Sequence, residues 1–258
     1  MIGEAIMTAR VAKGMTQEDL AASTSLTQAA LSRYEHDLRE PDPEVLKRIA
    51  DALGVTPELL KRAGRMEGGI AVSSHMRRRA TAKATVWKSL EAQLNMVRLH
   101  ATRLSDELSV NAQLQVPSWD PQDVPPDEAA RRLRSMWRMP SGPVHSLSPW
   151  LDAAGILVVL RDFGYGSRVD GLSQWADGFP VMLINSTAPT DRLRMTLAHE
   201  LGHVILHCND VPMDAEKQAN LFASELLMPA QEIRPSLHGL TIGRLGDLKR
   251  YWGYRWPR

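Results

Sequence analysis

The stretch that most constrains this chain runs from Thr196 to Cys208 and reads TLAHELGHVILHC. It contains the pentapeptide His199-Glu200-Leu201-Gly202-His203 within an otherwise apolar segment. Residues four apart on an α-helix share one face, so the two imidazoles can reach the same cation. Two imidazoles and a carboxylate inside a buried helix need partners, because burying an unpaired charge is costly. The stretch therefore predicts a buried helix that carries a metal site.

The glutamate of this pattern has a different expected role from the histidines. Glu200 lies roughly a third of a turn after His199, so its carboxylate is near the ion but outside the ligand shell. That is the place for a general base that takes a proton from water. The alternative interpretation is a buried helix with two hydrogen-bonded histidines and no metal. Because the pattern is short, the decision between them depends on a third ligand.

The third ligand is expected on a second predicted helix, which follows Pro212. On that helix Glu216 shares the apolar face with Ala219 and Ala223, three and seven positions later. A catalytic zinc ion usually has three protein ligands and one water, so Glu216 would complete a shell of two histidines and one glutamate. In the alternative interpretation, Glu216 only complements the helix dipole near the N-terminus.

Two further residues nearby could bind a metal but are not expected to. His207 lies eight positions after His199, which is about 12 Å along the same helix, too far for one ion to bind both. Glu225 falls off the apolar face of its helix by more than a quarter turn. We expect His207 to be a packing or surface residue.

Composition limits the class of protein. A chain of 258 residues with 43% hydrophobic residues is long enough for two small domains. No apolar run approaches eighteen residues and the N-terminus lacks a signal-peptide core, so we expect a cytoplasmic protein without a membrane partner. The single cysteine, Cys208, excludes an internal disulfide and is expected to be a small buried hydrophobic residue.

The N-terminal quarter of the chain predicts five short helices within residues 2–62. Thr16, with an acid three residues later, and Thr27 are candidate N-caps of the second and third helices. The turn between these two helices contains Ser25. Two short helices joined by a tight turn, within a bundle of five, form a helix-turn-helix arrangement.

The segments MTQEDLAASTSLTQAALSRYEHDLREP and IADALGVTPELL resemble the phage-repressor or XRE family of DNA-binding domains. The resemblance implies that operator DNA is a partner and that the third helix enters the major groove. It also implies a phosphate contact at the start of the second helix. The residues that it assigns to DNA contact are Gln17, Thr27, Gln28, Ala29, Ser32 and Arg33.

Two features of this N-terminal segment depart from the family. Ser25 and Asp37 stand where the family usually has glycine, although both residue types occur in turns and Asp tolerates a left-handed conformation. The first 64 residues also carry 8 basic and 10 acidic side chains. A single copy would therefore bind DNA weakly, and a homodimer on one operator, or help from the basic middle region, would restore affinity. The alternative is a helical protein-interaction module.

Residues 1–64 and 146–258 are expected to be domains, and residues 65–145 a helical linker region between them. Gly, Arg and Glu at 64–69 indicate a hinge, and the basic cluster at 77–83 indicates the solvated start of a helix. Apolar residues from Val86 to Leu108 recur at spacings of three and four and predict a long amphipathic helix to about Leu114. Prolines then exclude regular structure before Asp127, the expected cap of the next helix.

The last part of the chain predicts an α+β catalytic domain, mainly α, with a small sheet. Ile156–Leu160 (ILVVL) is apolar and β-branched, so we expect a central strand. Gly164, Gly166 and Gly171 are expected to lie in turns. Pro180–Asn185 predicts a second strand, followed by the loop that leads to the helix of His199.

The segments FPVMLINSTAPTDRLRMTLAHELGHVILH and EKQANLFASELLMP are similar to the ImmA/IrrE metallopeptidase family. The resemblance covers about residues 151–229 and implies a zincin-like, gluzincin-type domain. It implies Zn²⁺ at His199, His203 and Glu216, with Glu200 as general base. It also implies that strand 181–185 offers an edge to an extended peptide, and that the substrate is a repressor or other regulatory protein.

Taken together, the sequence predicts a cytoplasmic, DNA-binding transcriptional regulator that carries a zinc endopeptidase. An N-terminal five-helix helix-turn-helix bundle would bind the operator, and a zincin-like domain would cut a regulatory protein. The competing interpretation is a non-catalytic repressor or antitoxin with a structural or vestigial metal site. Glu200 favours the enzyme, because metal binding alone does not require it.

Overall fold

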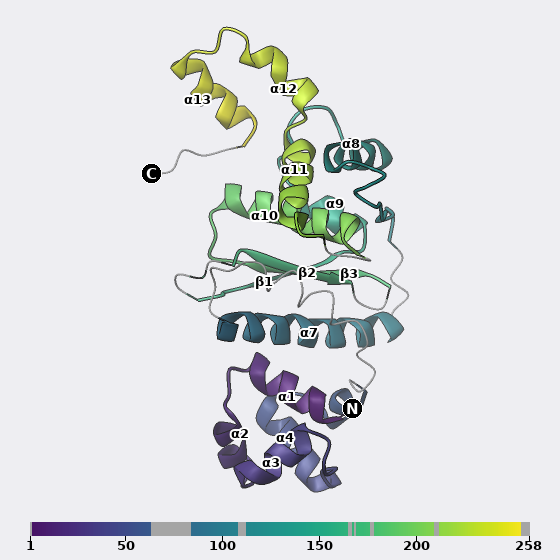
Figure 1. Cartoon of the computed structure of the whole chain (residues 1–258), viewed down its shortest axis with the longest axis vertical. Helices are drawn as coiled ribbons and strands as arrows, with labels where there is room; N and C mark the ends of the chain where they lie inside the picture. Colours follow the sequence, from purple (N-terminus) through teal and green to yellow (C-terminus); the bar gives the residue numbers. More distant parts are fainter. Residues whose placement is uncertain are drawn as a thin grey trace. The chain divides into compact units, whose positions relative to one another are not determined.

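The computed structural model describes residues 2–62, 84–107, 112–164, 167, 169–175, 178–208 and 212–253. The chain divides into two compact units, Met1–Ser109 and Val110–Arg258, and each is described by itself (Figure 1). The expected hinge at 64–69 and the expected basic cluster at 77–83 lie outside the described residues.

The segment 65–145 contributes a helix to each unit. Helix α7 (Ala84–Glu107) belongs to the first unit, where it packs against α1, and α8 (Pro126–Met136) belongs to the second. The predicted long helix does not extend to Leu114, which is not helical. The backbone N–H of Leu114 instead donates to the carbonyl of Ala153, in the second unit, at 2.9 Å.

The first unit contains, within residues 2–62, the five helices that the sequence predicts. They are α1 (Ile2–Ala12), α2 (Gln17–Ser23), α3 (Gln28–Glu35), α4 (Pro43–Leu53) and α5 (Pro57–Arg62). Both predicted N-caps are confirmed: Thr16 forms a capping box with Asp19, and the Thr27 side chain accepts from the backbone N–H of Ala30. Apolar side chains of α1 to α5 form one core, to which Met96 and Leu99 of α7 also contribute.

The two positions where the XRE family usually has glycine adopt left-handed backbone conformations. Ser25 has φ 55° and Asp37 has φ 53°. Asp37 offsets part of that cost by accepting a 2.9 Å hydrogen bond from the backbone N–H of Gly3. At Gly3 a Cβ atom would lie 2.2 Å from the Tyr34 carbonyl oxygen, so glycine is what allows α1 to approach the end of α3.

The strands of the second unit, in the part that the structure describes, form one small sheet in the order β1-β3-β2. The strands are β1 (Leu157–Arg161), β2 (Gly171–Trp175) and β3 (Pro180–Asn185). Strand β3 is central, parallel to β1 and antiparallel to β2, and all six of its residues are buried. Helix α9 (Ser148–Ala153) precedes β1.

Three expectations about the sheet are wrong. Ile156–Leu160 does not form a central strand, because β1 is an edge strand in which Leu160 is 57% exposed. The strand at 181–185 offers no edge to a peptide, because β3 is paired on both sides. Gly171 begins β2 rather than lying in a turn. An apolar run of strand length fits either position, and only pairing decides between them.

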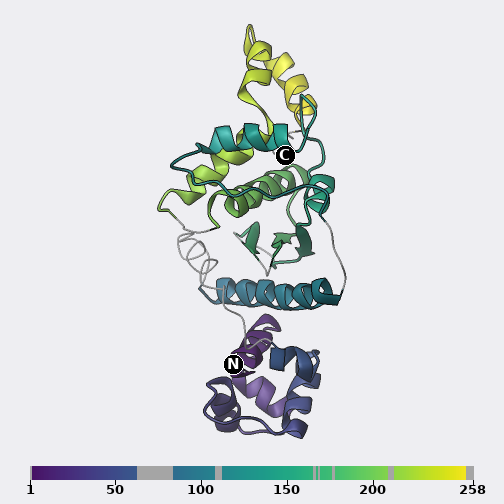
Figure 2. The same cartoon turned by 90° about the vertical axis from the view of Figure 1, so that its right-hand side faces the viewer.

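One long helix lies on the sheet and a second lies on the first, and together they build much of the core of the second unit (Figure 2). Helix α10 (Thr190–Leu206) packs against β2 and β3, and α11 (Ala215–Leu227) packs against α10 and α8. The predicted buried face of α11 is confirmed, because Ala219, Phe222 and Ala223 are each 0% exposed. Helices α12 (Ala230–Leu237) and α13 (Ile242–Tyr251) follow. The predicted fold class, α+β and mainly α, is confirmed.

Helix α8 begins one residue before the expected cap. Pro125 is the N-cap of α8 and Pro126 its first residue, so Asp127 lies in the first turn rather than at the expected cap position.

None of the described helices has the length and apolar character that crossing a membrane requires.

Candidate metal centre

Three side chains from two helices meet at one point in the second unit. His199 and His203 lie one turn apart on α10, and their Nε2 atoms are 3.0 Å apart. Glu216, in the first turn of α11, places its Oε2 3.5 Å from His199 Nε2 and its Oε1 3.5 Å from His203 Nε2. The three ligand atoms lie within 4.8 Å of one another, so the structure brings together the three residues that the sequence selects as metal ligands.

The hydrogen bonds of His199 indicate which of its nitrogens can bind a metal. Its Nδ1 lies 3.0 Å from Asn220 Oδ1. Because an amide oxygen only accepts, Nδ1 carries a proton, and in the neutral form of the ring Nε2 then has the lone pair. Two nitrogen lone pairs and a carboxylate that face one another fit a divalent cation of the zinc type. The donor set of His199, His203 and Glu216 therefore fits the group that the sequence predicts.

Glu200 lies beside this cluster and is buried, with 4% of its surface exposed. Its Oε2 accepts a 2.7 Å hydrogen bond from the hydroxyl of Ser173, which lies on β2. Strand β2 approaches α10 closely here, since a Cβ on Gly171 would lie 2.7 Å from the Thr196 methyl group. Sequence reasoning missed Ser173, because GLSQW is too short and polar to indicate a strand.

The close approach of α10 and α11 depends on Gly202, one of the two unspecified positions in the predicted metal motif. A Cβ on Gly202 would lie 3.1 Å from Phe222 Cδ1 and 3.2 Å from Ala219 Cα. Glycine therefore allows α11 to lie close enough for Glu216 to reach the two histidines.

His207 ends α10 and lies outside the three-residue cluster. It is nevertheless neither exposed nor a simple packing residue, because it is 3% exposed and both ring nitrogens have partners. Its Nδ1 lies 3.0 Å from His203 Nδ1, and its Nε2 lies 2.8 Å from Gln218 Oε1. Burial lowers the pKa of His207, partly opposed by the hydrogen bond to Gln218. The spacing of four from His203 was a signal that could have found this contact.

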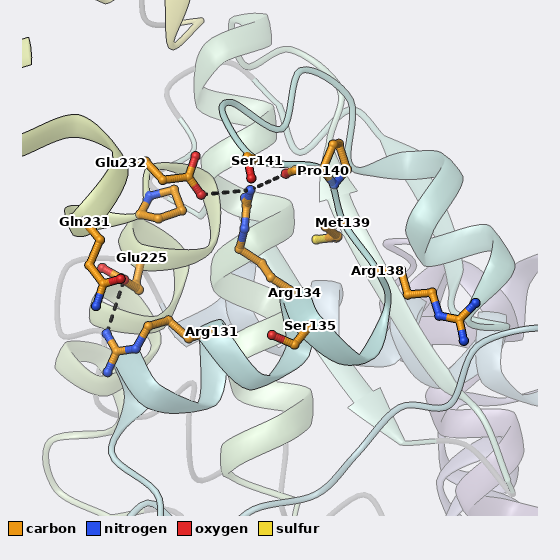
Figure 3. Close-up of a pocket in the computed structure, with 11 residues that line it drawn as sticks. Arg131, Arg134, Ser135, Arg138, Met139, Pro140, Ser141, Glu225, Gln231 and Glu232 are labelled. Atoms are coloured by element: carbon orange, nitrogen blue, oxygen red, sulfur yellow. Dashed lines mark hydrogen bonds and ion pairs between the residues drawn. The ribbon is translucent and has the colours of Figure 1, made fainter.

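Glu225 is also buried, but its partners lie on other elements. Its carboxylate accepts from Arg131 at 3.2 Å and from the backbone N–H of Ala230 at 3.1 Å. These contacts border a pocket of about 300 Å³ between α8 and α12 (Figure 3). Arg134 in this pocket donates to the carbonyls of Leu226 and Pro140, so its guanidinium links α8 to α11 and to the segment that follows α8.

The residues assigned to DNA contact gather at α2 and α3 of the first unit. Thr27, Gln28, Ala29 and Arg33 are exposed, whereas Gln17 and Ser32 are half-buried. The Gln28 side chain donates to Gln17 at 2.6 Å.

A buried ion pair of the first unit is hydrogen-bonded to Gln17, one of these two glutamines. Gln17 donates to Glu35 at 2.7 Å, and Glu35 pairs with Arg10 at 2.5 and 2.8 Å. The first glutamine at this surface is therefore oriented by a carboxylate that is fixed inside the bundle.

Comparison with known families gives two matches on separate segments. Residues 6–60 match the family model described as helix-turn-helix, of the XRE type. Residues 151–253 match the model described as IrrE N-terminal-like domain, a peptidase family. Searches of curated proteins and of solved structures each found no match. The two matched segments coincide with the segments on which both sequence resemblances rest.

Proposed function

We propose that the protein is a transcriptional regulator whose second unit is a zinc-dependent endopeptidase acting on a regulatory protein. The proposal starts from the two domains of the chain, an XRE-type helix-turn-helix domain and an ImmA/IrrE-like metallopeptidase domain. The observation that carries the proposal is Glu200. This buried carboxylate lies beside the cluster of His199, His203 and Glu216 and is held by Ser173. A site that only bound metal would have no need of it.

In this proposal His199, His203 and Glu216 hold the Zn²⁺ ion, and the rest of the chemistry belongs to neighbouring residues. When bound, zinc acts as a Lewis acid that polarises a peptide carbonyl and makes water more acidic. Glu200 takes a proton from the attacking water and delivers it to the leaving amine. The Ser173 hydroxyl holds the Glu200 carboxylate in one orientation during both transfers.

The substrate would bind along β2 rather than β3. In the described part of the sheet β2 is an edge strand, and its Ser173 contacts Glu200 directly. An extended peptide that added to this edge by backbone hydrogen bonds would pass next to the general base. This geometry favours an extended, locally unfolded segment of a protein as substrate.

Operator binding would use the exposed residues of α3. Gln28 and Arg33 have the side chains that commonly recognise adenine and guanine in the major groove. The acidic balance of the first 64 residues predicts weak binding by one copy. We therefore expect the operator-bound form to be a homodimer on two half-sites.

The decisive variant is Glu200→Gln, which removes the base and keeps the volume of the side chain. We expect it to bind zinc as the wild type does and to lose cleavage by about two to four orders of magnitude. The measurement combines elemental analysis with an electrophoretic assay on the protein products of neighbouring genes. Glu58→Gln, at an exposed position in α5, is the control and should cleave normally. Retained cleavage by Glu200→Gln would contradict the proposal.

A second candidate function is a non-catalytic repressor or antitoxin with a structural metal site. The exposed surface of α3 is common to both candidates, so DNA binding does not separate them. Zinc in the wild type without cleavage of any neighbouring-gene product would favour this second candidate.

A further inference from the structure

We propose that His207 and Gln218 are positioning residues for the ligand His203, whose tautomer they fix through a chain of hydrogen bonds that ends at Asp214. The inference rests on the proposed function, because it concerns the metal that His199, His203 and Glu216 would hold. The motif H-E-x-x-H does not by itself require either positioning residue.

The donor and acceptor in each of these hydrogen bonds follow from the far end of the series, at Asp214. The carboxylate of Asp214 accepts hydrogen bonds and has no proton to donate. The side-chain nitrogen of Gln218 donates to Asp214 Oδ1 at 3.1 Å. The oxygen of the same amide therefore faces the other way and lies 2.8 Å from His207 Nε2. Because that oxygen accepts, His207 carries a proton on Nε2.

The next bond fixes the tautomer of the metal ligand. In a neutral imidazole protonated at Nε2, Nδ1 has a lone pair and can only accept. His207 Nδ1 lies 3.0 Å from His203 Nδ1, so His203 must be the donor and carry its proton on Nδ1. His203 Nε2 then has the lone pair, and this atom lies 3.0 Å from His199 Nε2. The series of hydrogen bonds therefore leaves His203 Nε2, the nitrogen that faces the cluster, with the lone pair that a metal ion needs.

The same helix orients both histidines. Glu216, Gln218 and Asn220 all belong to the first half of α11. Glu216 is the proposed third ligand, Asn220 accepts from His199, and Gln218 acts on His203 through His207. When α11 packs on α10, it therefore supplies a ligand and sets the tautomers of the other two.

Packing alone does not account for His207. Its side chain is 3% exposed, and its ring lies 5.1 Å from that of His203 with the planes tilted by 51°. An apolar residue would fill this volume without the cost of burying two polar nitrogens. Both nitrogens instead have partners at 3.0 Å or less, which holds the ring in one orientation.

The test compares two variants of the full-length chain with a matched control. His207→Phe keeps a buried ring but removes the acceptor for His203, and Gln218→Leu removes the acceptor for His207. His145→Phe makes the same change as the first variant at an exposed position outside the chain of hydrogen bonds. Zn²⁺ affinity of the metal-free proteins is measured in competition with a chromophoric chelator. We expect about 10- to 100-fold weaker binding for both variants and wild-type affinity for the control.

A spectroscopic measurement separates positioning from a general structural effect. In the metal-free wild type, the ¹⁵N chemical shifts of the His203 ring should show the proton on Nδ1. In Gln218→Leu they should show a mixture of tautomers, while circular dichroism stays that of the wild type. If His207→Phe does not fold, Gln218→Leu at its half-buried position still decides the question.

The outcomes distinguish this inference from the proposed function. Wild-type zinc affinity and an unchanged His203 tautomer in a folded Gln218→Leu would overturn the roles of His207 and Gln218 and leave the metal centre intact. A wild type that binds no Zn²⁺ would overturn the metal centre and this inference with it.

Discussion

At the scale of single residues, the second unit places its reactive groups by pairwise hydrogen bonds rather than by exposure to solvent. His199, His203 and Glu200 are each less than 10% exposed and each has a side-chain partner. Such partners restrict rotamers and tautomers before any ligand binds. Changing a partner should therefore alter function while leaving the fold in place.

Ser173→Ala tests this for the proposed general base. The substitution removes the hydroxyl that donates to Glu200 at 2.7 Å and leaves the backbone of β2 unchanged. We expect cleavage to fall by about 10- to 100-fold, with zinc content and thermal stability close to those of the wild type. Ser173→Thr, which keeps the hydroxyl, should retain most of the activity. Equal loss in both variants would show that the hydrogen bond is not the cause.

Another prediction at this scale concerns pH and Glu128 on α8. Hydrogen bonds from Arg132 and then Arg131 lower the pKa of the Glu128 carboxyl below its ordinary value. Because this pKa is lower in the folded state than in the unfolded one, the unfolded chain binds the proton more readily as the pH falls. The stabilisation is present above the ordinary carboxyl pKa and is lost as the pH falls through the folded value.

The measurement for Glu128 is the thermal midpoint of the wild type and of Glu128→Gln as a function of pH. The wild type should be the more stable at pH 7, and the difference should shrink as the pH is lowered. A difference that stays constant down to pH 3 would mean that the ion pairs with Arg131 and Arg132 do not contribute.

At the scale of elements, the candidate metal centre is a product of helix packing. His199 and His203 come from α10 and Glu216 from α11, so the site exists only while the two helices are close. At Gly202 the two helices are so close that a Cβ atom would lie 3.2 Å from Ala219 Cα. The spacing of these helices should therefore control both stability and metal affinity.

Gly202→Ala tests this control. Its new methyl group would lie 3.1 Å from Phe222 Cδ1 and 3.2 Å from Ala219 Cα, so α11 must shift. We expect a loss of about 1–3 kcal/mol in the free energy of unfolding of the second unit, together with weaker zinc binding. Gly246→Ala in α13 is the matched control, because a Cβ there meets open space.

The control should change stability in the opposite direction, by up to about 1 kcal/mol, because alanine favours a helix over glycine. Denaturant unfolding of the two variants, followed beside zinc affinity, makes the comparison. Wild-type stability and affinity in Gly202→Ala would show that α10 and α11 tolerate a wider spacing.

At the scale of the whole molecule, each unit has a core of its own. The core of the first unit draws on α1 to α5 with support from α7, and that of the second on α8 to α11 and the sheet. Separate cores predict that losing a ligand in one unit does not unfold the other.

His203→Ala tests this independence. It removes a proposed ligand that belongs to the second unit. We expect zinc to be lost, while binding to the DNA upstream of the gene stays within about twofold of the wild type. Binding is measured by fluorescence anisotropy at a fixed salt concentration, because phosphate contacts make affinity salt-dependent. A large drop in DNA affinity would mean that the metal centre controls operator binding.

Sequence reasoning succeeded where a feature depends on local periodicity or capping. The caps at Thr16 and Thr27, the five N-terminal helices and the buried face of α11 all follow from rules that act within a few turns of helix. The choice of His199, His203 and Glu216 also came from spacing, and the structure places these three side chains together. These patterns are readable because neighbours along a helix are also neighbours in sequence.

Apart from the contact between His203 and His207, the site and sheet features that sequence reasoning missed depend on contacts between distant segments. Nothing in ILVVL or PVMLIN indicates which strand is central, because hydrogen bonds to other strands decide it. Ser173 was missed because its partner Glu200 lies 27 residues away, and Gln218 because it meets His207 only once α11 packs on α10. The sequence alone thus selected the residues that we propose as metal ligands and base. Only the tertiary structure decided which groups hold them, because tautomers, strand edges and helix spacing are set by contacts that exist only in the folded chain.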